Sequence, residues 1–269
     1  SGMSTFRGGN GLWDNVPVEE ICTPEGWYRN PAKVLAFYNK LRAGLKDIQP
    51  NEAHRIVAQL ESDYNVCVVT QNVDNLHERA GSTRVVHLHG ELTKVRPEDC
   101  YTDHDGYSLK YVEDVGYSPV ELGQTGGSRS RHLRPHIVWF GEAVPNLETA
   151  ARLVSVADIL VIVGTSLQVY PAASLYHYAP AGCRIFLIDP DSHLGRQVPG
   201  VIFINDVAQP VCESSGHYWL KTDCSAGVPL NVYLQISEKD LYLQPQATLA
   251  QSVEQRIRNA QVRSEEHTS

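Results

Sequence analysis

The chain has 269 residues, of which 42% are hydrophobic and 20% charged, and its formal net charge is -8 at pH 7. That length accommodates one large domain and a smaller module, and the negative charge argues against non-specific binding to nucleic acid. No apolar run approaches the ~20 residues that span a bilayer, and no signal peptide opens the sequence, so we expect a cytoplasmic protein without a membrane partner.

The first sixty residues begin with a glycine-rich loop and then predict two helices. Phe6 and Arg7 lie in the loop sequence TFRGG, which on its own is typical of a flexible terminus. Asn30-Pro31 supplies an N-cap and a first-turn proline, and apolar residues then recur at helical spacing as far as Leu45. A second amphipathic helix is predicted to begin at Asn51.

Polar side chains follow directly after an apolar, β-branched run at residues 66–70, which predicts a buried strand. These polar residues are Gln71, Asn72 and Asp74. In open α/β sheets ligands bind at the carboxyl ends of the strands, so amides and a carboxylate at this point indicate ligand contacts.

A second predicted strand, residues 85–89, runs into His89-Gly90. Glycine permits a sharp backbone turn there, which would leave the His89 imidazole at the sheet edge beside the first strand's polar group. A histidine on an apolar strand is more often a core residue. The adjacent glycine and the polar group favour an active-site base instead.

The remainder of the sequence predicts two more strands that end in polar residues. The apolar run 159–163 is typical of a central parallel strand and is followed by Gly164, Thr165 and Ser166, where small residues and free amides suit a phosphate or ribose. The strand at residues 184–188 ends in Asp189, an acceptor for a ribose hydroxyl.

Five motifs together resemble the sirtuins, the NAD-dependent protein lysine deacylases, and are closest to the bacterial members. They read SGMSTFRGGNGLW at the start, TQNVDNLHERAG, HLHGEL, LRPHIVWFGE and GTSLQVYPAA. The resemblance covers residues 1–212 and implies an α/β fold: a doubly wound parallel, Rossmann-like sheet with a small discontinuous module from about residues 11–47 and 92–132. Residues 213–269 form a divergent extension, and the final RSEEHTS is read as a sequence artefact.

The resemblance implies NAD as cofactor and acyl-lysine proteins as substrates, with nicotinamide, free lysine and O-acyl-ADP-ribose as products. Phe6 is implied to cover the nicotinamide ribose and Arg7 to contact the phosphates. His89 and Asn72 are the implied catalytic residues. Further implied cofactor contacts are Gln71, Asn72, Asp74, His89, Gly164, Thr165, Ser166 and Asp189.

The resemblance also implies a cleft for the acyl-lysine peptide, formed by strand addition along the VWFGE segment. Its implied residues are Val138, Trp139, Phe140, Gly141 and Glu142, although the two aromatic residues are equally compatible with a plain core. Sirtuins that prefer acidic acyl groups carry Tyr-x-x-Arg on the first helix. Here Leu41 follows Tyr38 at that spacing and Arg42 comes one position later, so Arg42 is either a displaced acyl-pocket residue or an ordinary surface arginine.

The sequence lacks two parts of the sirtuin pattern. The chain begins downstream of the first apolar strand and the GAGxS loop with which sirtuins bind the pyrophosphate. Where sirtuins carry four zinc cysteines, residues 92–132 contain only Cys100. Asp103, His104, Asp105 and His132 lack paired-cysteine spacing, so we predict no structural zinc.

Two alternatives therefore stay open beside deacylation. An NAD glycohydrolase or ADP-ribosyltransferase would use the same nicotinamide pocket without a peptide cleft. A non-catalytic NAD- or peptide-binding fragment is the other alternative, because the glycine loop and zinc cysteines are missing.

Overall fold

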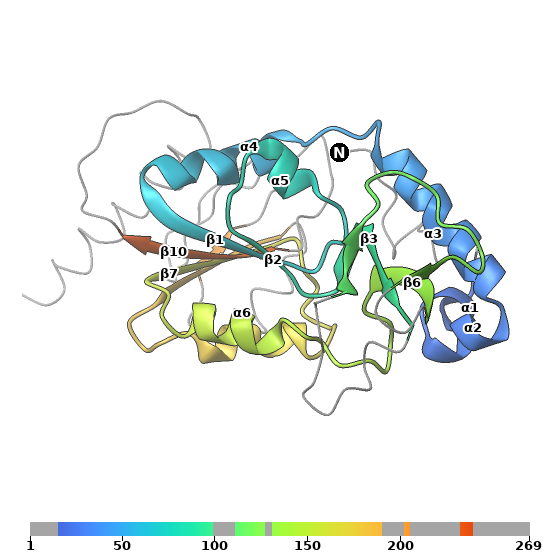
Figure 1. Ribbon diagram of the computed structural model, residues 1–269. Helices are drawn as coiled ribbons and strands as arrows, with labels where there is room; N and C mark the ends of the chain where they lie inside the picture. Colours follow the sequence, from blue (N-terminus) through green and yellow to red (C-terminus); the bar gives the residue numbers. More distant parts are fainter. Residues whose placement is uncertain (1–15, 99–110, 127–130, 190–201, 205–231, 239–269) are drawn as a thin grey trace, which may run out of the picture.

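The computed structural model describes residues 16–98, 111–126, 131–189, 202–204 and 232–238. Two bodies of structure lie side by side in it: a six-stranded sheet with helices on both faces, and a smaller module of three helices and a four-stranded sheet (Figure 1). Among the described residues, no helix combines the length and the apolar character needed to cross a membrane.

The six-stranded sheet has the strand order β2-β1-β10-β7-β8-β9. β1 (Tyr64–Thr70) and β2 (Val85–His87) are parallel to each other, as are β7 (Ile159–Val163), β8 (Arg184–Ile188) and β9 (Ile202–Ile204). The α/β fold and these parallel pairs confirm the prediction. One strand differs: β10 (Val232–Glu238) lies between β1 and β7 and is antiparallel to both, so the sheet is mixed rather than wholly parallel.

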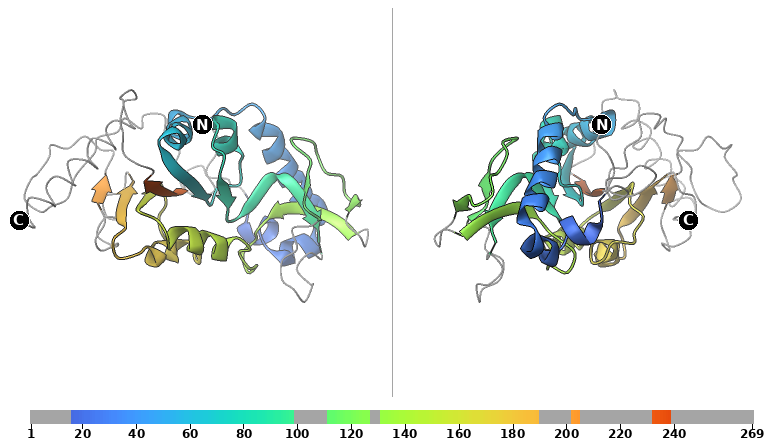
Figure 2. Two further views of the ribbon diagram at one scale, coloured as in Figure 1. Left: turned by 60° about the vertical axis from the view of Figure 1, so that its left-hand side comes forward. Right: turned by 90° about the vertical axis from the view of Figure 1, so that its right-hand side faces the viewer.

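Helices cover both faces of this sheet (Figures 1 and 2). α4 (Glu52–Gln59), the short η2 (Leu60–Ser62) and α5 (Leu76–Ala80) lie on one face, and α6 (Leu147–Val154) and η4 (Ala172–Tyr178) on the other. Strand side chains alternate between the faces. On β7, for example, Ile159 and Val161 belong to the core cluster under α4, whereas Leu160 and Ile162 belong to the cluster that includes residues of α6.

The smaller module combines α1 (Val18–Ile21), α2 (Pro24–Arg29) and α3 (Pro31–Leu45) with a sheet of order β4-β3-β6-β5. Its strands are β4 (Glu113–Asp114), β3 (Gly90–Pro97), β6 (Arg131–Ile137) and β5 (Thr125–Gly126). A buried aromatic cluster holds helices and strands together, with Trp27, Tyr38 and Trp139 each at most 3% exposed.

Local signals account for the two predicted helices, whose starts are confirmed. The Asn30 side chain accepts a hydrogen bond from the Lys33 backbone at the start of α3. At α4, Asn51 and His54 form a reciprocal capping box, which satisfies donors that a helix start leaves unpaired.

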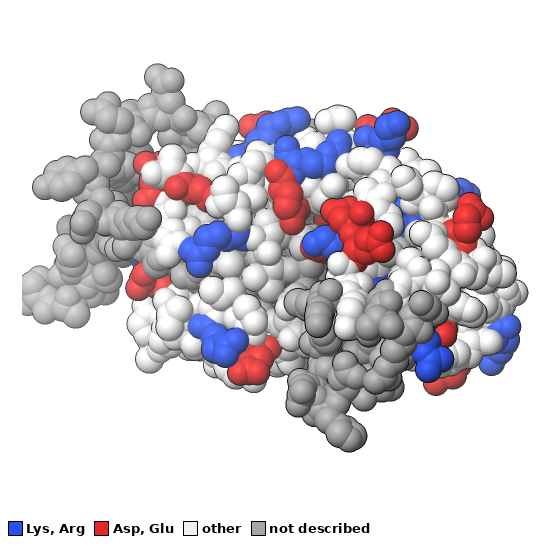
Figure 3. Space-filling model, viewed as in Figure 1, with Lys and Arg blue, Asp and Glu red and all other residues white. Residues whose placement is uncertain are grey.

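Charged side chains of both signs are interspersed on the face shown in Figure 3. No broad basic surface is visible among the described residues there. This distribution agrees with the negative net charge of the chain and offers no field that would attract a polyanion to that face.

Candidate active site

The predicted polar groups meet where β1 and β7 end. Gln71 follows β1 directly, and its Nε2 donates to Oγ1 of Thr165, which lies two residues beyond β7, at 3.3 Å. Thr165 is only 4% exposed. The carboxyl ends of two strands that are distant in sequence therefore form one site, as the predicted parallel arrangement required.

His89 lies at this site with a defined tautomer. Its Nδ1 is 3.2 Å from the carbonyl oxygen of Gln71, and because a carbonyl only accepts, Nδ1 carries the proton. Nε2 has no partner among the described residues. Burial lowers the pKa of His89, and the hydrogen bond to Gln71 partly opposes that shift. The ring is therefore neutral at pH 7 and presents a free lone pair, which is the state of a general base.

The turn after His89 depends on glycine. Gly90 has φ +85°, and a Cβ at this position would lie 2.0 Å from the carbonyl oxygen of His136. β3 and β6 approach each other that closely at their ends, where Gly90 pairs with Ile137. The predicted sharp turn is confirmed, and its further cause is this close approach of two backbones.

Asn72 is half-buried and has a fixed backbone with a free side chain. Its N–H donates to Oγ1 of Thr70 at 3.0 Å, and its carbonyl oxygen accepts from Nδ1 of His87 at 3.0 Å. Its side-chain amide makes no hydrogen bond with any described residue. A half-buried, unpartnered amide beside a neutral histidine is suited to receive a polar ligand.

Asp74 plays a structural part in the same loop. Its carboxylate accepts from the Leu76 backbone at 3.0 Å, which organises the turn into α5. Burial raises the pKa of Asp74, and the Leu76 hydrogen bond opposes the rise. A direct contact of Asp74 with the cofactor stays a prediction.

The ends of β7 and β8 present the remaining predicted cofactor residues. Gly164 has φ +58° and donates to the Ile188 carbonyl at 2.9 Å. Ser166 is exposed, and Asp189 is 7% exposed at the end of β8. Phe6 and Arg7 lie outside the described residues.

Arg42 is not a surface arginine, and that alternative is wrong: its side chain is fully buried. Nε donates to the Leu92 carbonyl at 2.8 Å, and Nη1 donates to Oδ1 of Asn39 at 2.7 Å. Tyr38, one turn earlier on α3, points its hydroxyl to Nε1 of Trp139 at 3.2 Å. The structure therefore directs the two side chains to different partners.

The segment after β6 is a tight turn rather than a strand edge, because β6 ends at Ile137. The N–H of Val138 donates to the His89 carbonyl, and that of Phe140 donates to the Cys22 carbonyl. These bonds join the segment to both bodies of the protein. Strand addition along this segment would have to use backbone groups other than these two N–H donors, such as those of Gly141, which is exposed.

The two aromatic residues of this turn have different environments. Trp139 is a core residue at 2% exposure, packed on Trp27, which is the alternative left open by the sequence. Phe140, by contrast, is 43% exposed.

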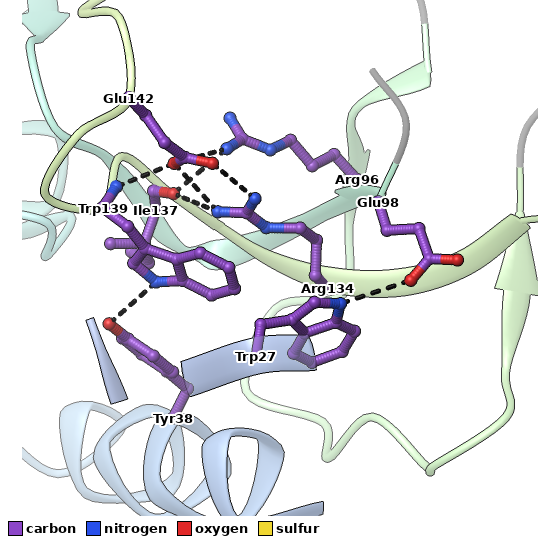
Figure 4. A network of polar contacts seen from close by, with 8 residues as sticks. All are labelled: Trp27, Tyr38, Arg96, Glu98, Arg134, Ile137, Trp139 and Glu142. Carbon is purple, nitrogen blue, oxygen red and sulfur yellow. Dashed lines mark hydrogen bonds and ion pairs between the residues drawn. The ribbon is translucent and has the colours of Figure 1, made fainter. Parts of the chain in front are cut away.

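Glu142 is the centre of a buried ionic network (Figure 4). Its carboxylate accepts from Arg134 at 2.6 Å and 3.0 Å, from Arg96 at 3.2 Å and from the Trp139 backbone at 2.8 Å. The Arg134 guanidinium also lies 3.3 Å from the centre of the Trp139 ring. The network occupies the Glu142 carboxylate, and the place of Glu142 beside a peptide stays a prediction.

Sequence reasoning missed Arg96 and Arg134, which are 0% and 3% exposed. They are directly opposite each other on β3 and β6. Neither stands out in the sequence, since only the pairing of the two strands brings their charges to one carboxylate.

One group of residues among those described has the geometry of a cation site. The ligand atoms of Glu78, His87 and Glu91 all lie within 4.8 Å of one another. Both carboxylates already have a cationic partner, since Lys94 pairs with Glu91 and His87 contacts Glu78 at 2.8 Å. Ion pairs within the protein therefore account for this group. His132, one of the polar residues considered as zinc ligands in the sequence, is exposed beside Glu98. The other residues considered there lie outside the described residues.

Comparisons with known proteins match the Sir2 family model to residues 1–171. The chain is 53% identical over 203 residues to an NAD-dependent protein deacylase of Bacteroides thetaiotaomicron, covering 74% of this chain and 84% of that protein. It resembles the crystal structure of a Sir2 homologue with NAD at a TM-score of 0.60 and 38% identity, over 71% of this chain and 73% of that one. A Sir2 variant with a deacetylated p53 peptide and 3'-O-acetyl ADP-ribose gives a TM-score of 0.60 at 27% identity, over 77% and 82%.

Proposed function

The chain belongs to the Sir2 family, and from that premise we propose that it is an NAD-dependent protein lysine deacylase. The observation that carries the proposal is the state of His89. Its Nδ1–H is bound to the Gln71 carbonyl, its Nε2 is free, and burial lowers its pKa. A neutral imidazole with one free nitrogen is what proton abstraction at neutral pH requires.

The residues around His89 fit NAD. The unpartnered Asn72 amide is suited to hydrogen-bond the nicotinamide or its ribose, and the small residues Gly164 and Thr165 leave room for a ribose or phosphate. Asp189 supplies an acceptor at the end of β8. Phe6 and Arg7 are proposed to complete the site over the reacting ribose and the phosphates.

When bound, NAD would supply the ribose carbon that takes the acyl oxygen as nicotinamide leaves. One water would then replace the lysine nitrogen on the acyl carbon, so the products would be nicotinamide, free lysine and O-acyl-ADP-ribose. The protein's residues orient the reactants and move protons. The side-chain amide of Asn72 orients the nicotinamide or its ribose. His89 accepts a hydroxyl proton at Nε2, and its Nδ1–H bond to Gln71 keeps the ring in the required tautomer.

The substrate is proposed to be an acyl-lysine side chain of a protein. The exposed Phe140 and Gly141 border the turn that joins the large sheet to the small module. A peptide laid against this turn would meet the Val138 carbonyl as an acceptor. We place the reaction in the cytoplasm, where the thiols of Cys22 and Cys67, both free in the structure, stay reduced.

Among acyl groups, we propose that acetyl-lysine is used at least as well as succinyl-lysine. A succinyl carboxylate requires a guanidinium beside the Tyr38 hydroxyl, and that of Arg42 is bound to the Leu92 carbonyl and Asn39. Leu41→Arg is expected to raise the rate on succinyl-lysine more than on acetyl-lysine. A strong succinyl preference of the wild type that Arg42→Ala abolishes would reverse this proposal.

The test of the activity is nicotinamide release with and without an acyl-lysine peptide. Release that requires the peptide, and that His89→Ala abolishes, is the expected result. His177→Gln, a change at an exposed histidine of η4, is the matched control and is expected to behave like the wild type. Equal release with and without peptide would assign the protein to the NAD glycohydrolases, and no release would leave a binding module.

A further inference from the structure

Two histidines hold two consecutive carbonyl oxygens of the loop that follows β1. Nδ1 of His89 contacts the Gln71 carbonyl at 3.2 Å, and Nδ1 of His87 contacts the Asn72 carbonyl at 3.0 Å. Since carbonyls only accept, both Nδ1 atoms carry protons. The first contact sets the tautomer of His89. The second fixes the backbone of Asn72, whose side chain is the free amide of the site.

His87 is itself anchored from three sides. Asn146, which precedes α6, donates to its carbonyl at 2.8 Å. The next residue, Leu88, is fully buried, and its N–H bonds to the Thr70 carbonyl at 2.9 Å. On the other side of the ring, Nε2 lies 2.8 Å from Oε1 of Glu78 on α5. The imidazole therefore connects the loop to α5, and the backbone at His87 and Leu88 ties the residue to the core.

The surroundings of the ring favour its doubly protonated form. Burial alone lowers the pKa of His87, but the hydrogen bond and charge of Glu78, helped by Glu91, outweigh it, so the pKa is raised overall. The other titratable and charged groups that face it are Asp74 in the loop, His77 on α5, Lys94 on β3 and His136 on β6. With both nitrogens protonated, the ring donates to Asn72 and Glu78 at the same time.

We propose that His87 is a positioning residue for the reaction: bound between the Asn72 carbonyl and Glu78, it holds Asn72 in place beside His89. The proposal rests on the proposed deacylase function. It assigns no contact between His87 and the substrate. Its consequence is that turnover depends on the donor at the Nδ1 position more than on the bulk of the ring.

Two substitutions separate the two halves of the ring. The amide nitrogen of Asn in His87→Asn reaches the position of Nδ1 and restores the bond to the Asn72 carbonyl. In His87→Gln the longer side chain places its amide at the position of Nε2, beside Glu78. The Asn72 carbonyl is then left without its donor. Both variants lose the buried ring, so a purely structural role predicts equal effects of the two.

The expected result is that kcat falls roughly tenfold or more in His87→Gln, as displacement of an active-site group does, and much less in His87→Asn. The KM for the peptide is expected to stay the same in both. Hydrogen–deuterium exchange in residues 70–76 is expected to rise in the Gln variant alone. His177→Gln is the control for the substitution itself and is expected to leave both readouts unchanged.

A second variant does not disturb the core. Glu78 is 40% exposed, so Glu78→Ala should fold, and it is expected to lower kcat and to raise exchange in the same loop. Equal kcat and equal exchange in the Asn and Gln variants, or an unchanged Glu78→Ala, would overturn the proposal. If the wild type released no nicotinamide with peptide, the proposed function would fail by itself, and the exchange comparison would still decide whether His87 holds the loop.

Discussion

Removal of the Glu142 carboxylate tests whether this residue is structural. In Glu142→Ala, Arg134 loses two hydrogen bonds and Arg96 loses one, and the Trp139 N–H loses its acceptor. The Arg96 and Arg134 side chains are 0% and 4% exposed, and that of Glu142 is 7% exposed. Water therefore cannot easily replace the lost carboxylate.

Breaking a buried ion pair by removing one partner costs about 3–5 kcal/mol, because a desolvated charge is left without compensation. Here a single carboxylate faces two guanidinium groups, so the upper half of that range applies. For a domain of this size each kcal/mol lowers Tm by about 2–4 °C. The expected loss of Tm is thus roughly 8–20 °C. Glu142→Gln keeps an acceptor but not the charge, and is expected to fall between the alanine variant and the wild type.

Thermal and urea unfolding, together with the KM for the peptide, decide the question. The control is Glu148→Ala on α6, where the glutamate side chain is 83% exposed and pairs with Arg152. Surface pairs of this kind contribute little, so its stability should stay within about 0.5 kcal/mol of the wild type. A Glu142→Ala protein that melts like the wild type and differs only in a raised peptide KM would refute the structural reasoning.

Three further predictions concern the fold. Gly90→Ala is expected to destabilise by roughly 3 kcal/mol or more, because its Cβ would lie 2.0 Å from the His136 carbonyl oxygen at φ +85°; an unchanged urea midpoint would contradict this. Burial lowers the pKa of His54 to about 4 and those of His77 and His136 to about 3. The folded state holds these histidines neutral while the unfolded state takes up protons below pH 6.5. Stability should therefore be full above pH 6.5 and fall towards pH 5 by about 2 kcal/mol for each histidine, or roughly 5–6 kcal/mol for the three. Urea titrations at pH 7 and 5 measure this, and equal stability at both would contradict it. A chain that ends before residues 232–238 should lose cooperative unfolding in circular dichroism, because two neighbouring strands lose their ladder; an unaltered transition would show that the strand is dispensable.

Local patterns were sufficient to predict much of the fold. The caps at Asn30 and Asn51 and the apolar runs 66–70, 159–163 and 184–188 each carry their information within a few residues, and the structure confirms the corresponding elements. The polar residues after β1 and β7 were also predictable, since strands of a parallel sheet place their carboxyl ends together.

The interactions that hold the site together were not predictable in this way. The burial of Arg42 follows from its bond to the Leu92 carbonyl, 50 residues away in the sequence. The Glu142 network likewise depends on Arg96, 46 residues earlier. A buried arginine has the same local sequence signature as an exposed one, because partners on another strand determine its burial.

The antiparallel β10 explains why the two halves of the site lie at one level. Val232, its first residue, pairs with Thr70 on one side and with Val163 on the other, and these are the last residues of β1 and β7. Gln71 and Gly164 therefore leave the sheet at the same height, which allows Gln71 to reach Thr165. Apolar and polar residues alternate in the sequence at residues 230–236. Such alternation is typical of a strand but does not give its place in a sheet, since it describes a single strand and not its neighbours. A shift of one residue in either ladder would move the two strand ends apart and separate Gln71 from Thr165.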